Sequence, residues 1–252
     1  MPVFGHELWQ RPTSEVASFW DTTADWRVRY FEDLKATQPE LLSDALQAER
    51  EFVLMEERIT MSEVTAAQII VELGCGVGRS LWRPARTYVG SRFVGIDFAM
   101  GQLRRLKHIQ VSEQLHNLSA IAANVALLPL VAESADAILI LNQTFGTFLG
   151  NVRTAVLREI GRTLRRDGFI LIGGFDAVGL AQGCYSEWNV PLLHSDKESG
   201  FFQLAHYNSF WQKEEWLVSE LGENGFIVAR RERSSLGYVL IFRRQSDASV
   251  HR

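Results

Sequence analysis

Glu72 is followed by three glycines in alternating positions, Gly74, Gly76 and Gly78. The apolar run that contains Glu72, residues 69–73, is typical of a buried parallel strand. Glycines after such a strand let the backbone turn sharply and leave space for a bound molecule. A second acid, Asp97, ends the next apolar run, residues 93–97. Because an acid at this point can accept hydrogen bonds from both hydroxyls of a ribose, the pattern predicts a nucleoside-binding site.

The elements that would position these side chains alternate along the chain. Strand-like runs cover residues 69–73, 93–97, 118–123, 135–141 and 169–175, with helix-like segments between them at residues 79–88, 99–115 and 151–165. This alternation predicts an α/β fold with a Rossmann-like doubly wound sheet of mostly parallel strands. Only Ser234 and Ser235 separate two last runs, residues 226–233 and 236–244, so these should form an antiparallel C-terminal hairpin.

Three features interrupt the alternation. Pro84 lies inside a helix-like segment, where its missing N–H and its ring predict a kink or a late helix start. Residues 166–168, Arg-Asp-Gly, should turn the chain into the fifth strand. Residues 176–210 contain several glycines and many polar and aromatic residues, and we expect them to form an insertion.

The segment before the first strand, residues 1–62, is rich in aromatic side chains. It should contain two helices, at residues 14–35 and 44–61, the second capped by Ser43. We therefore expect a helical N-terminal cap over residues 1–62 and a ligand-binding domain over residues 63–252. Two interpretations of the cap stay open. Its helices could simply pack on the sheet edge, or its aromatic side chains could close over a ligand as a lid.

Composition limits the class of partner. The 252 residues carry a formal charge of −4, which argues against a nucleic-acid partner. No apolar run approaches the roughly 20 residues of a membrane helix, and the N-terminus does not resemble a secretory signal. The two cysteines, Cys75 and Cys184, form no Cys-x-x-Cys pair. These features predict a cytoplasmic protein with reduced thiols, and both a monomer and a homodimer stay open.

Several stretches resemble the class I S-adenosylmethionine-dependent methyltransferases. Residues 71–78, Val-Glu-Leu-Gly-Cys-Gly-Val-Gly, resemble that family's first motif, an acid followed by Gly-x-Gly-x-Gly. Asp97 matches its ribose-binding acid. Residues 122–129 and 158–169 are similar to its third strand and its approach to the fifth strand, and the hairpin to its last two strands. The resemblance implies a methyltransferase domain at residues 63–252, with S-adenosyl-L-methionine as cofactor and S-adenosyl-L-homocysteine as product.

The resemblance also implies which residues bind the cofactor. Glu72 carries over as a residue near the methionine ammonium group. Asn124 stands where the family commonly has an Asp beside the adenine, and its carboxamide can still accept a hydrogen bond. The implied cofactor-binding residues are Glu72, Gly74, Cys75, Gly76, Gly78, Asp97, Phe98, Asn124, Val125 and Asn142.

Two other functions compete with methyl transfer. A nicotinamide-dependent oxidoreductase needs a third glycine at the position where this chain has Arg79. The terminal hairpin also disfavours this function, because a purely parallel dinucleotide-binding fold lacks it. A second alternative is a non-catalytic S-adenosylmethionine-binding protein that acts as a sensor or as the partner of an enzyme. This alternative stays open because an intact glycine turn indicates binding but does not indicate catalysis.

The expected reaction is methyl transfer to a nitrogen or oxygen of a small molecule by direct in-line displacement. It depends on positioning more than on a catalytic dyad. His206 is a candidate base because histidine titrates near neutral pH, and Asn142 is a second candidate catalytic residue. No metal is expected, because His194 and His206 lack metal-ligand spacing. Candidate substrate-binding residues are Trp20, Tyr30, Phe145, Tyr185, Trp188, His194, His206 and Tyr207.

Overall fold

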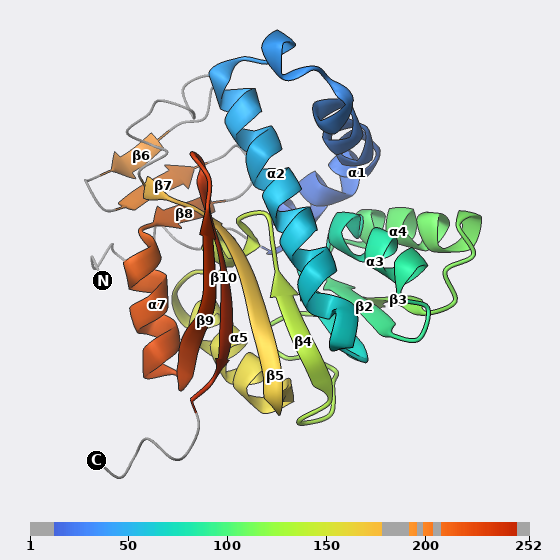
Figure 1. The fold of residues 1–252 in the computed structure, drawn as a ribbon, viewed down its shortest axis with the longest axis vertical. Helices are drawn as coiled ribbons and strands as arrows, with labels where there is room; N and C mark the ends of the chain where they lie inside the picture. The colour runs from blue at the N-terminus through green and yellow to red at the C-terminus, as the bar shows by residue number, and fades with distance from the viewer. Residues whose placement is uncertain (1–12, 178–191, 196–198, 204–207, 246–252) are drawn as a thin grey trace.

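A seven-stranded sheet forms the centre of the protein (Figure 1). The computed structural model describes residues 13–177, 192–195, 199–203 and 208–245. The strand order is β3-β2-β1-β4-β5-β10-β9. The strands are β1 (Ile69–Leu73), β2 (Arg92–Asp97), β3 (Leu118–Ala122), β4 (Ala135–Ile140), β5 (Leu164–Phe175), β9 (Phe226–Arg233) and β10 (Gly237–Arg244). The first five are parallel, and β10 is antiparallel to both β5 and β9. The predicted Rossmann-like fold with its C-terminal hairpin is confirmed.

Helices cover both faces of this sheet. The helices are α1 (Thr13–Ala36), α2 (Asp44–Glu63), α3 (Arg79–Thr87), α4 (Met100–Ser112), α5 (Gly150–Thr163) and α7 (Glu214–Glu223), with short 3-10 turns η2 (Pro39–Leu41), η3 (Val64–Ala66) and η4 (Thr144–Thr147). Ile70 and its neighbours pack with α2, α3 and α4 on one face. Val71 packs with α5 and α7 on the other. Neighbouring residues of a strand point to opposite faces, so β1 is buried on both sides.

Of the two N-terminal helices, α2 packs on one face of the sheet and α1 lies against α4 (Figure 1). Ser43 caps α2, because its hydroxyl accepts the Leu46 N–H. The helix α1 rests on the start of α4: Asp21 Oδ1 accepts the Gly101 N–H at 2.5 Å. A Cβ on residue 101 would lie 2.7 Å from the Asp21 Cα, so glycine allows this close approach. The cap is therefore fastened next to the end of β2.

The helix α3 spans Arg79–Thr87 and contains Pro84, so the predicted helix is present and a late start is excluded. One sequence-based boundary is wrong. Residues 166–168 do not turn the chain into a new strand, because β5 already begins at Leu164. Leu164 pairs with Ala135 while Phe169 pairs with Ala137, so the intervening residues form an irregularity inside one long strand.

The insertion contains structure that the sequence did not predict. Three antiparallel strands, β6 (Leu192–Ser195), β7 (Ser199–Gln203) and β8 (Asn208–Gln212), form a second small sheet. Gln143, in the turn after β4, donates a hydrogen bond from Nε2 to the Phe210 carbonyl at 2.8 Å. Its Oε1 accepts the Phe175 N–H at 2.6 Å. The second sheet is thereby joined to the carboxyl ends of β4 and β5.

Candidate active site

The glycine turn after β1 adopts backbone conformations that other residues rarely take. Gly74, Gly76 and Gly78 all have positive φ, between 53° and 74°. A Cβ on residue 74 would lie 2.5 Å from Thr144 Cγ2, and one on residue 78 would overlap Leu106. Glycine at position 74 therefore keeps the cavity open beside η4. At position 78 it lets the start of α3 pack on α4.

Asp97 connects the end of β2 to this turn. Its Oδ2 accepts the Gly76 N–H at 2.8 Å, and its Oδ1 accepts the Ala99 N–H at 2.9 Å. The side chain is buried, and that burial raises the pKa of the carboxyl despite the backbone donors. Each carboxylate oxygen still has a second lone pair, so Asp97 can also accept hydrogen bonds from a ligand in the cavity.

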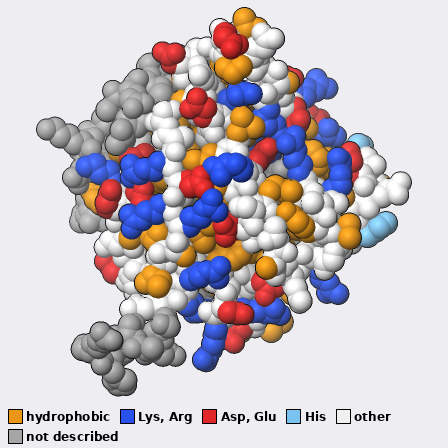
Figure 2. All heavy atoms as spheres, viewed as in Figure 1, with side chains coloured by type: hydrophobic (Ala, Val, Ile, Leu, Met, Phe, Trp, Pro, Cys, Tyr) orange, Lys and Arg blue, Asp and Glu red, His pale blue; other side chains and the backbone are white. Residues whose placement is uncertain are grey.

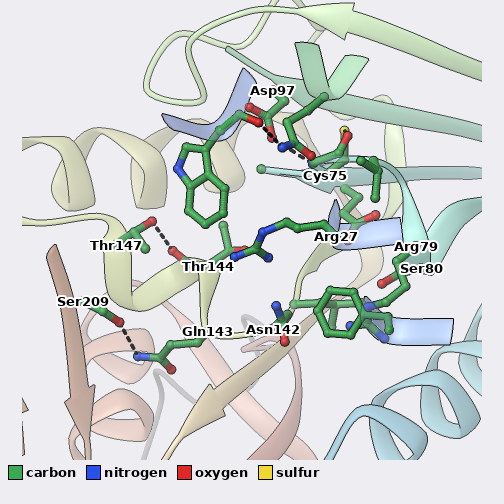
Figure 3. A pocket seen from close by; sticks show the side chains of 18 of the residues that line it. Arg27, Cys75, Arg79, Ser80, Asp97, Asn142, Gln143, Thr144, Thr147 and Ser209 are labelled. Carbon is green, nitrogen blue, oxygen red and sulfur yellow. Dashed lines mark hydrogen bonds between the residues drawn. The ribbon is translucent and has the colours of Figure 1, made fainter. Parts of the chain in front are cut away.

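A cavity of about 530 Å³ lies above the carboxyl ends of β1, β2 and β4. Figure 3 shows Asp97 and Cys75 towards one end, Gln143 and Ser209 towards the other, and Arg27 between them. Ligands of open α/β sheets bind at this edge, where the strand order reverses. In this sheet the reversal falls between β1 and β4. The cavity thus lies where the topology favours a binding site.

Buried charges surround the inner wall of the cavity. Glu56 of α2 is fully buried and accepts a hydrogen bond from Arg79 Nη2 at 2.7 Å and another from the Asn142 N–H at 2.6 Å. Arg79 also contacts Glu57 at 3.4 Å and lies over the Phe31 ring at 4.9 Å. This network joins the cap to the start of α3 and to the turn after β4.

Three buried side-chain oxygens of the cavity wall lack a hydrogen-bond partner among the residues that the structure describes: Glu72 Oε2, Gln102 Oε1 and Asn142 Oδ1. Burial raises the pKa of Glu72 to about 8, against the opposing field of Arg79. A buried acceptor without a donor costs roughly 1–3 kcal/mol. These three atoms are therefore suited to accept hydrogen bonds from donor groups on a ligand.

The raised pKa of Glu72 predicts a pH-dependent stability of the ligand-free protein. Between pH 4.5 and about 8 the folded protein holds a proton that the unfolded chain releases, so the free energy of unfolding should fall as pH rises through this window. Urea unfolding at several pH values measures this slope. Glu72→Gln should make it shallower, because one of the contributing groups is removed. An unchanged slope in Glu72→Gln would contradict a raised pKa of Glu72 in the folded protein.

The structure brings most of the sequence-predicted site residues to the cavity. Those that line it are Trp20, Tyr30, Glu72, Gly74, Cys75, Gly76, Asp97, Phe98, Val125 and Asn142. Cys75 is buried with a free thiol, and burial raises the pKa of that thiol far above its usual range. It therefore serves as a small wall residue and not as a nucleophile.

Three predicted residues lie elsewhere. Asn124 is exposed, and its Oδ1 accepts the Ala126 N–H at 2.9 Å in a local turn, so it does not line the cavity. Gly78 packs against Leu106. Phe145 is buried in the core against Phe148. The remaining candidates, Tyr185, Trp188, His206 and Tyr207, lie outside the described residues, and of His194 the structure describes only its backbone in β6.

Sequence reasoning missed several polar residues of the cavity wall. Arg27 and Glu49 belong to the cap helices, and Arg79 was considered only as a position that should be glycine in another family. Glu49 carried a usable signal, because it falls among the buried residues Ala45, Ala48 and Phe52 of α2. A carboxylate on the apolar face of a helix indicates a buried partner or a ligand.

Within the described part of the chain, no helix is both long and apolar enough to cross a membrane. The same residues contain no group of three or more His, Cys, Asp or Glu side chains that could hold a metal ion.

The central part of the chain matches a known protein family. Residues 70–168, from β1 into β5, match the family model described as a methyltransferase domain. No curated protein matches the chain. Solved structures resemble it across almost its whole length, at sequence identities that show a common fold.

Three of these structures illustrate the similarity. The magnesium protoporphyrin IX methyltransferase of Synechocystis PCC 6803 covers 93% of this chain and 100% of its own, with 15% identity and a TM-score of 0.67. The 1,6-didemethyltoxoflavin-N1-methyltransferase of Burkholderia thailandensis covers 98% and 93%, with 15% identity and a TM-score of 0.65. A methyltransferase of Methanosarcina mazei covers 75% and 98%, with 17% identity and a TM-score of 0.61.

The first two of these enzymes were crystallised with S-adenosylhomocysteine bound. In the present chain, the matched domain contains the glycine turn and Asp97. Residues 70–168 therefore match a methyltransferase domain, and the chain has the Rossmann-like class I fold that these S-adenosylmethionine-dependent enzymes share.

Proposed function

We propose that the protein transfers the methyl group of S-adenosyl-L-methionine to a nitrogen or oxygen of a small molecule by direct in-line displacement. The observation that carries this proposal is the continuity of the cavity. It runs from the glycine turn and Asp97 to aromatic side chains of α1 and of the second sheet, such as Tyr30 and Trp211. One continuous cavity thus offers a nucleoside site and an aromatic acceptor site side by side.

The cofactor end has matching groups for the ribose hydroxyls and the ammonium group of S-adenosyl-L-methionine. Asp97 can accept hydrogen bonds from the ribose hydroxyls. The partnerless oxygens of Glu72 and Asn142 suit the ammonium group. The backbone of residues 74–76 leaves room for the methionine part, since a side chain at position 74 would meet Thr144. Phe98 and Val125 offer apolar contacts to the adenine.

When bound, the cofactor supplies a methyl group on a positively charged sulfur, which is already a good electrophile. The chain's own task is to align the acceptor atom behind that methyl group and to exclude water. Alignment of this kind can be worth effective molarities of about 10⁵–10⁸ M. Asn142 and Thr144 follow the end of β4 and line the cavity, so they are placed to orient the methionine end of the cofactor.

The size of the cavity favours a small acceptor. Its volume of about 530 Å³ lies in the range of small-molecule sites, about 300–1,000 Å³. Figure 2 shows basic and acidic side chains interspersed on one face of the molecule. Arg230, for example, pairs with Glu63 at 2.6 Å. Two similar enzymes are named for small planar acceptors, a toxoflavin precursor and magnesium protoporphyrin IX. Residues 1–62 would then act as the lid of a domain formed by residues 63–252.

Methyl transfer from labelled cofactor tests this proposal. Radiolabelled S-adenosyl-L-methionine should deliver its methyl group to a component of a small-molecule extract and not to total tRNA, because the cavity admits only small acceptors. Scintillation counting after separation by size measures both. Transfer to tRNA without transfer to the extract would contradict a small-molecule acceptor, and binding without transfer to either would favour a non-catalytic protein.

A further inference from the structure

Glu49 lines the cavity, and the proposed cofactor contacts do not include it. It lies on α2 among residues that pack against the sheet, and only 9% of its surface is exposed. Its Oε2 accepts the hydroxyl hydrogen of Tyr30 at 2.5 Å. No ion pair to Glu49 is found within the described part of the chain, in contrast to Glu56. Its second oxygen, Oε1, therefore stays available to a ligand.

Tyr30 holds this carboxylate in place. The ring of Tyr30 stacks on Trp26 at a centroid distance of 4.9 Å and meets Phe31 edge-on at 5.3 Å. Two ring contacts fix the direction of the hydroxyl group. Burial raises the pKa of the Tyr30 phenol, so it stays protonated and donates to Glu49. The pair comes from two different helices of the cap, α1 and α2, and both side chains face the same cavity.

The charged groups that face Glu49 oppose the effect of burial on the pKa of its carboxyl. Arg27 of α1 and Arg79 of α3 lower the pKa of the Glu49 carboxyl, as does the Tyr30 hydroxyl, but burial is the larger effect and raises it. A carboxylate of raised pKa is a stronger base than one at the surface, and it is closer to the working range of a general base.

The walls around this pair indicate the kind of acceptor. Aromatic side chains line much of the cavity that contains the pair: Trp20, Trp26, Tyr30, Phe31, Phe98, Phe148, Phe175 and Trp211. Aromatic walls favour a flat ring. The guanidinium groups of Arg27 and Arg79 line the same cavity, and they disfavour a positively charged acceptor.

We propose that Glu49, positioned by Tyr30, is the general base for an uncharged aromatic acceptor whose reacting atom carries a proton, as in a phenol or a ring N–H. This inference rests on the proposed methyl transfer and adds the acceptor class to it. The acceptor's lone pair forms the new bond to the methyl carbon, and the sulfur–methyl bond breaks with its electron pair left on sulfur. The acceptor's proton moves to the Glu49 carboxylate and then to water.

Glu49→Gln tests the role of the base, because the amide keeps the shape and can still accept the Tyr30 hydrogen bond. With the acceptor found in the extract, kcat should fall by about 10²–10⁴-fold, while the Kd for S-adenosyl-L-homocysteine stays within about twofold. The wild-type rise of kcat with pH, which reports ionisation of Glu49, should disappear. Glu51→Gln, an exposed position on the same helix, serves as the matched control and should change neither quantity.

Tyr30→Phe separates positioning from catalysis. It removes a hydrogen bond that lowers the pKa of Glu49, so the rising limb of the profile of kcat against pH should move to higher pH. The fall in kcat should be smaller than the fall in Glu49→Gln. A tyrosine that only fills space would leave the pH profile where it is.

Calorimetry with 2-naphthol and 2-methoxynaphthalene, in the presence of S-adenosyl-L-homocysteine, gives a readout that needs no turnover. Only 2-naphthol can donate a hydrogen bond to Glu49. The ratio of the affinity for 2-naphthol to the affinity for 2-methoxynaphthalene should therefore grow with pH in the wild type and stay constant in Glu49→Gln. Equal pH dependence in both proteins, or unchanged kcat in Glu49→Gln, would overturn the role of Glu49. Failure of the wild type to bind S-adenosyl-L-homocysteine would instead count against the proposed function.

Discussion

Arg79→Met should lower the free energy of unfolding by about 3–5 kcal/mol at pH 8, the range expected when one partner of a buried ion pair is removed. Arg79 is 9% exposed and contacts the fully buried Glu56 at 2.7 Å. Without it, Glu56 and Glu72 would have to be buried as unpaired charges or take up protons. Since proton uptake is easier at low pH, the loss should be smaller at pH 6 than at pH 8. Urea unfolding at both pH values measures the effect.

Arg83→Met is the matched control on the same helix. Arg83 pairs with Glu57 at 3.1 Å, but its side chain is 41% exposed. Exposed pairs contribute roughly 0–1 kcal/mol, so this variant should stay close to the wild type. Adding Glu56→Gln to Arg79→Met should recover part of the lost stability, because the unpaired charge is then removed. A loss below about 1 kcal/mol for Arg79→Met would show that the buried network does not hold the cap to the sheet.

Asp97→Ala should weaken binding of S-adenosyl-L-homocysteine by about 100-fold, equivalent to about 2.7 kcal/mol. The variant removes a charged acceptor for the ribose hydroxyls, and hydrogen bonds to charged groups are worth roughly 1.5–3 kcal/mol. It also leaves the N–H groups of Gly76 and Ala99 without their present acceptor, so the glycine turn becomes less well fixed. Isothermal titration calorimetry of both proteins measures the change.

Asp136→Ala is a suitable comparison for Asp97→Ala. Asp136 also accepts two backbone N–H groups, from Gln68 at 3.0 Å and Ile69 at 2.7 Å, but it does so where β1 begins and not at the cavity. It should lower stability and leave the affinity for S-adenosyl-L-homocysteine unchanged. If both variants bind the ligand as the wild type does, Asp97 does not contact the ribose.

The fold could be predicted because its signals are local. The strand before Gly74, the positive-φ glycines and Asp97 all lie within about thirty residues, and hydrophobic periodicity identified the alternating elements. The hairpin followed from the short separation between its two strands. The same local reading failed at residues 166–168, where pairing of Leu164 with Ala135 overrides a sequence that favours a turn.

The missed parts of the site depend on contacts between distant residues. Glu49 and Tyr30 are 19 positions apart, and Glu56 and Asn142 are 86 apart. No spacing rule links such pairs, so only the packing of α1 and α2 on the sheet shows that they share one cavity. The strands β6, β7 and β8 were missed because they pair with one another in a segment rich in glycine and polar residues. Asn124 was misplaced because its side chain closes a local turn with Ala126.

The central claim is that the cavity between the glycine turn and the N-terminal cap binds the methyl donor. Calorimetric titration of the wild-type protein with S-adenosyl-L-methionine, S-adenosyl-L-homocysteine and NADH in parallel tests it most directly. The structure predicts one-to-one binding of the first two in the micromolar range and no binding of NADH, because Arg79 stands where a dinucleotide site needs its third glycine. Binding of NADH without binding of either sulfur compound would contradict the claim.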